Sequence, residues 1–94
     1  MAVDAATADT VLRAIGRLPI GQRREPAAVR SALRSALGGR YVIEVDAPTP
    51  TAAYRPNVFV HVISDPPQTC LAAYIRPTGA VSEPIVAQGI DCRT

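Results

Sequence analysis

The fold of this chain is decided by residues Pro26–Asp46, PAAVRSALRSALGGRYVIEVD, because the spacing of apolar side chains changes within them. Before Gly38 the apolar residues recur every three or four positions, as on one face of a helix, and after Gly39 every second position, as in a strand. Proline in the first turn and paired glycines at the end are typical helix borders. The stretch therefore predicts a helix followed directly by a half-buried strand.

A first helix is predicted from about Asp4 to Leu18. Asp4 or Thr7 offers the side-chain oxygen of an N-cap, and Gly16 with Pro19 marks the exit. The side chains expected on the buried faces of the two helices are Ala8, Val11, Leu12, Ile15 and Leu18, then Val29, Ala32, Leu33, Ala36 and Leu37. The polar connection between the helices suits two packed helices better than a helix-turn-helix.

Period-two alternation predicts three strands after the second helix, at 40–46, 57–64 and 70–76. Residues 65–68 contain two prolines and form a natural turn, so the second and third strands should pair as an antiparallel hairpin. A fourth strand near Val81 or at 85–87 is weakened by Pro84. We therefore expect an α+β fold, with two N-terminal helices packed on one face of a three- to four-stranded antiparallel sheet.

The composition is typical of one globular domain spanning residues 1–94. The chain is 48% hydrophobic and 19% charged, which is enough apolar material for one core. No run of about 18 apolar residues could span a bilayer, and the N-terminus lacks the basic start and apolar stretch of a signal peptide. We therefore expect a soluble, cytoplasmic protein with no membrane partner.

The sequence contains no recognisable catalytic, metal or cofactor motif. His61 is the only histidine, the two cysteines lack Cys-x-x-Cys spacing, and the glycines follow no phosphate-loop pattern. A small enzyme that uses His61 and Cys70 as base and nucleophile is the least favoured alternative, because a lone strand histidine is usually a packing residue. Cys70 and Cys92 could form a disulfide, but the lack of a secretion signal favours the reduced form. We expect neither enzymatic activity nor a cofactor.

All ten basic residues are arginine, and they are concentrated in the helical part of the chain. Residues 1–40 hold seven arginines and three acidic residues, a net charge of +4, whereas 41–94 carry a net charge of −2. A stripe on and before the second helix consists of Arg23, Arg24, Arg30 and Arg34. Sequence-independent, salt-sensitive nucleic-acid binding by this stripe is the alternative function, although no aromatic residue lies within it to stack on bases.

The sheet face away from the helices is the candidate functional site. Alternation places Tyr41, Ile43, Val45, Val58, Val60, Val62, Leu71, Ala73 and Ile75 under the helices, with Ile43 and Val60 as core residues. The opposite face then holds Val42, Phe59, Ile63 and Tyr74 among Glu44, Asp46, His61 and Arg76.

Exposed apolar surface with a charged rim is typical of a partner site or a homodimer interface. The competing interpretation is that residues 81–90 fold back and cover this face. Glu44 and Asp46 also resemble a carboxylate pair for acid or metal chemistry, although solvent-facing strand positions are commonly charged. We expect a small non-enzymatic protein-binding module, such as a regulator, an inhibitor or an immunity-type accessory factor, that binds a protein partner or a second copy of itself.

Overall fold

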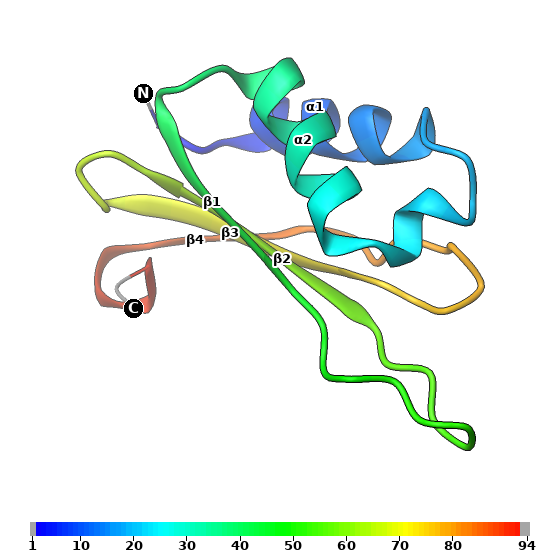
Figure 1. Ribbon diagram of the computed structural model, residues 1–94. Helices are drawn as coiled ribbons and strands as arrows, with labels where there is room; N and C mark the ends of the chain where they lie inside the picture. The colour runs from blue at the N-terminus through cyan, green and yellow to red at the C-terminus, as the bar shows by residue number, and fades with distance from the viewer. Residues whose placement is uncertain (1, 93–94) are drawn as a thin grey trace.

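The computed structural model describes residues 2–92 and contains two helices followed by a four-stranded antiparallel sheet. In chain order the elements are α1 (Ala5–Gly16), the 3-10 turn η1 (Gln22–Arg24), α2 (Pro26–Leu37), β1 (Tyr41–Asp46), β2 (Val58–Ser64), β3 (Thr69–Ile75), β4 (Ile85–Gln88) and the 3-10 turn η2 (Gly89–Cys92). Both helices lie on one side of the sheet (Figure 1). The predicted α+β fold is confirmed.

Asp4 and Thr7 together form the N-terminal cap of α1. The Asp4 carboxylate accepts hydrogen bonds from the Thr7 backbone N–H (3.0 Å) and hydroxyl (3.1 Å), and the Asp4 N–H donates to Thr7 Oγ1 (3.2 Å). These bonds to the ionised carboxylate hold the pKa of Asp4 below its ordinary value. The helix ends at Gly16, before the predicted Leu18, while α2 begins at Pro26 as predicted.

The strands pair in chain order, β1-β2-β3-β4. The β2–β3 turn is organised by Ser64, whose hydroxyl donates to the Pro66 carbonyl (2.8 Å) and accepts from the backbone N–H groups of Gln68 and Thr69 (3.1 and 3.0 Å). The fourth strand forms despite Pro84, because that residue precedes the strand and removes no ladder hydrogen bond. Val81 makes only an isolated bridge to Ile75.

The hydrophobic core lies between the helical layer and the sheet. Ile43 and Val60 are buried in it, as predicted, and so are Val11, Ile15, Val29, Leu33, Val45, Val58, Val62, Leu71 and Ile75. Leu18 and Leu37 pack against the core while partly buried. The prediction for Ala36 is wrong: its side chain is exposed, because a methyl group is too short to fill the shallow hollow that it shares with Asp4 and Tyr41.

The connection between β1 and β2 projects from the body of the molecule as an arm (Figure 1). Thr51 and Tyr54 close its tip through two backbone hydrogen bonds, of 2.9 and 3.3 Å. The Tyr54 side chain is half exposed there. Within residues 2–92 neither helix has the length and apolar character needed to cross a membrane.

Candidate functional site

The face of the sheet opposite the helices, called the open face below, carries three rows of side chains from neighbouring strands. The register aligns Asp46 with Phe59 and Tyr74 in one row, Glu44 with His61, Ala72 and Ile85 in the next, and Val42 with Ile63, Cys70 and Ala87 in the third. Because alternate residues of a strand point to the same side, all of these side chains leave the sheet away from the helices.

Large apolar side chains on the open face remain in contact with solvent. Phe59 is 51% exposed, Val42 48% and Ile85 70%. These three residues come from three different strands, so the exposed apolar surface extends across the sheet. Such a surface is typical of an interaction site.

A hollow of about 180 Å³ opens on this face, between Glu44 and Asp46 of β1, Phe59 and His61 of β2, and Ala72 of β3. The short side chain of Ala72 leaves room between the larger residues of its row. A second hollow, of about 350 Å³, lies on the other side of Glu44 and is lined by Val42 and Asp65 among others. Glu44 therefore stands between two depressions.

Ile63 lies on the predicted side of the sheet, but it is buried beneath the C-terminal turn. It packs with Cys70 and Cys92, and with Ala87 of β4. A partner cannot reach Ile63 in this structure. Residues 85–92 thus cover one corner of the open face and leave the surface around Phe59 and Val42 uncovered.

Cys70 and Cys92 form a disulfide, with their Cα atoms 5.4 Å apart. The prediction of reduced cysteines is wrong, because β4 pairs beside β3 and the following turn returns the chain over Cys70. The bond also removes Cys70 as a thiol nucleophile. His61 pairs with Ala72 in the register, so His61 and Cys70 do not form the catalytic pair considered above.

Tyr74 and Arg76 border the open face at the end of β3. The guanidinium carbon of Arg76 lies over the Tyr74 ring, 5.9 Å from its centroid, at cation–π range. The His61 side chain is half-buried, and its ring nitrogens make no hydrogen bond with any of residues 2–92.

Two members of the predicted arginine stripe are engaged inside the fold. Arg23 donates to the carbonyl oxygens of Gly16 (2.9 Å), Leu18 (2.9 Å) and Gly79 (3.1 Å). Arg30 donates to the carbonyl oxygen of Val45 (3.0 Å) and joins α2 to β1. Only Arg24 and Arg34 of the stripe are exposed.

A larger hollow, about 610 Å³, lies between the arm and the start of α2. Five of its lining residues are prolines, and Arg24 and Arg55 also line it. Half of its lining residues are exposed residues of the arm, whereas the hollow on the open face is lined by residues of paired strands.

Sequence reasoning missed Ile85 as a member of the open face and gave Ala72, which alternation places on that face, no role in the site. Ile85 carried a signal, an isoleucine in a short apolar run, but Pro84 obscured the strand. Ala72 carried no such signal, because its contribution is the space that its small side chain leaves.

Among the described residues, no group of three His, Cys, Asp or Glu side chains could hold a metal ion. Comparison with protein-family models, curated proteins and solved structures gave no match.

Proposed function

We propose that this protein is a binding module without enzymatic activity, and that it binds a protein partner, or a second copy of itself, through the open face. The observation that carries the proposal is the half-exposed phenyl ring of Phe59, which borders the hollow on a face rimmed by Glu44, Asp46 and Arg76. Aromatic anchors beside a polar rim are the usual energetic centre of a protein interface.

A regulator, an inhibitor or an immunity-type accessory factor acts in this way, because it binds a partner and catalyses no reaction. The burial of Ile63 reduces the candidate surface to Phe59, His61, Tyr74, Val42 and Ile85 with their charged neighbours. The proposal leaves out the nucleic-acid alternative, because Arg23 and Arg30 are already bound to carbonyl oxygens.

The disulfide bears on where the protein acts. Disulfides persist in oxidising compartments and are rare in the cytosol. The Cys70–Cys92 bond therefore favours an oxidising environment over the cytoplasmic location expected from the sequence.

The test compares wild type with Phe59→Ala. Removing an aromatic side chain from the centre of an interface weakens the binding free energy by on the order of 2 kcal/mol, which is about thirtyfold in affinity. We expect Phe59→Ala to weaken association by that amount, measured by sedimentation velocity for self-association and by quantitative capture from the native extract for a partner.

The matched control is Tyr54→Ala, since Tyr54 is as exposed as Phe59 but lies on the arm. We expect this variant to associate like the wild type. The proposal would be contradicted if Phe59→Ala associated as strongly as the wild type. It would also be contradicted if the wild type were a monomer for which capture finds no partner.

A further inference from the structure

Two neighbouring carboxylates on the open face make no ion pair within residues 2–92. Glu44 and Asp46 are two residues apart on β1, so their side chains leave the sheet on the same side, roughly 7 Å apart along the strand. Neither side chain makes a hydrogen bond or an ion pair with any of residues 2–92. Arg76, at the far border of the face, lies over Tyr74 instead.

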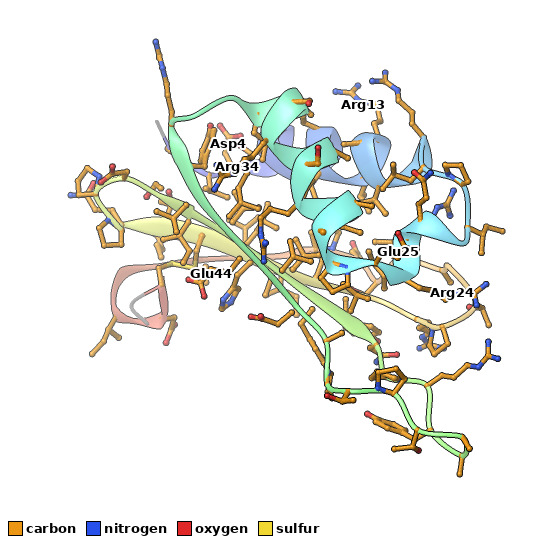
Figure 2. All side chains as sticks on the ribbon, viewed as in Figure 1. Asp4, Arg13, Arg24, Glu25, Arg34 and Glu44 are labelled. Atoms are coloured by element: carbon orange, nitrogen blue, oxygen red, sulfur yellow. A yellow bond between two sulfur atoms is a disulfide. The ribbon has the colours of Figure 1, made fainter. Side chains whose placement is uncertain are left out.

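The helical part of the chain, residues 1–40, carries a net charge of +4. Figure 2 shows Glu44 on the side of the sheet away from the helices, and Arg13, Arg24 and Arg34 with Asp4 and Glu25 on the helical side. Glu44 and Asp46 place two acidic side chains beside the hollow, and a cation brought by another molecule would complement them.

The surroundings of the carboxylates favour one kind of cation. Phe59 is paired with Asp46 in the register and lines the same hollow, so a group held by the carboxylates also meets an aromatic ring. A guanidinium presents five planar donors that suit carboxylates, and it stacks on aromatic faces, whereas an ammonium is a compact and strongly hydrated point charge. Arg76 over Tyr74 already shows a guanidinium placed on an aromatic ring at this face.

We infer that the occupant of the open face is a peptide segment of a partner protein that places an arginine side chain in the hollow between Glu44, Asp46 and Phe59. The inference rests on the proposed function, since it names the chemistry of the partner. Val42, two residues from Glu44 on β1, and Ile85, paired with Ala72, are exposed and provide apolar surface for the residues that flank the arginine.

The probe is an acetylated and amidated pentapeptide, valine-serine-arginine-serine-valine, which in extended form presents valine, arginine and valine on one side. Its binding to the ¹⁵N-labelled protein is followed by NMR chemical-shift mapping. We expect shifts at Glu44, Asp46, Phe59 and His61. A peptide with glutamine in place of arginine should bind at least about fivefold more weakly.

The variant is the double substitution Glu44→Gln and Asp46→Asn, and its control is Asp9→Asn with Glu25→Gln on the helical layer, an equal change of charge. We expect the first to weaken binding of the arginine peptide at least about fivefold and the second to leave it nearly unchanged. We also expect the first to be about as stable as wild type, because neither side chain makes a hydrogen bond or an ion pair with any of residues 2–92. Lower stability would show that the carboxylates hold the fold together and would overturn the inference.

The inference also fails if the glutamine peptide binds equally well, or if the shifts lie elsewhere. If Phe59→Ala abolishes capture of a partner while Glu44→Gln with Asp46→Asn leaves capture intact, the proposed function stands and the arginine inference is wrong. If the double substitution instead dissolves a homodimer, the occupant is a second copy of this chain, which likewise overturns it.

Discussion

Arg23 shows how a single side chain can be removed from a candidate functional surface by the fold. Its guanidinium binds the carbonyl oxygens of Gly16, the last residue of α1, of Leu18 just beyond it, and of Gly79 in the connection between β3 and β4. Carbonyl groups at a helix C-terminus lack intrahelical partners and attract cations. Arg23 therefore joins three segments that are distant in sequence.

We expect Arg23→Ala to lower the free energy of unfolding by about 1–2 kcal/mol, because it leaves three carbonyl groups without this donor. Arg24→Ala, on the exposed neighbour, should change it by less than about 0.5 kcal/mol. Arg23→Lys should not restore stability, since one ammonium cannot span three separated oxygens. Urea unfolding measures all three variants, and equal midpoints for Arg23→Ala and wild type would contradict this role.

Gly79 illustrates a residue whose identity is required by its position. Its φ angle is +91°, a region that side chains with a Cβ rarely adopt, and an added Cβ would lie 2.9 Å from Ile20 Cγ2. The loop before η1 therefore packs directly against the turn after β3.

At the scale of the element, the pleat of the strands determines which side chains are buried. Val60 of β2 lies in the core, while Val42 of β1, a residue of the same type, is half exposed on the open face. The two valines therefore offer a matched pair for testing the assignment of the faces.

We expect Val60→Asp to unfold the domain. An unpaired carboxylate in the core lowers the free energy of unfolding by more than roughly 4–5 kcal/mol, a loss that only the most disruptive substitutions reach. Val42→Asp should fold, with a loss below about 1 kcal/mol. Circular dichroism during thermal unfolding measures both. A cooperative transition for Val60→Asp at the wild-type midpoint would show that the faces are reversed.

At the scale of the whole molecule, the disulfide ties the end of the chain to an inner strand. The Cys70–Cys92 bond closes a segment with a sequence separation of 22 and holds η2 over Ile63. Restricting the unfolded chain in this way stabilises the folded state, and the effect grows slowly with the size of the closed loop.

We expect Cys92→Ala to lower the free energy of unfolding by about 3 kcal/mol. It should also increase hydrogen exchange in the C-terminal turn and near Ile63, where the cover loses its covalent attachment. A thiol reductant should lower the stability of the wild type toward that of the variant and leave the variant unchanged. Equal stability of the oxidised wild type and Cys92→Ala would contradict the assignment.

The sequence by itself determined the order and type of the two helices and of the first three strands. Apolar spacing in Pro26–Leu37 and Tyr41–Asp46 is a local property, and it predicts both the change from helix to strand and the burial of Ile43 and Val60. The open face followed from the same alternation, because side chains that do not point toward the helices must point away from them.

Only the tertiary structure decided which of those side chains are free to bind. Ile63 and Phe59 are both large apolar residues of β2, and alternation directs both to the same side of the sheet. A segment that follows later in the chain covers Ile63 and leaves Phe59 exposed. The arginines of the stripe are likewise equivalent in sequence, and the fold brings carbonyl oxygens to Arg23 and Arg30 but not to Arg24. Periodicity fixes the direction of a side chain, whereas its accessibility depends on distant segments whose position periodicity does not encode.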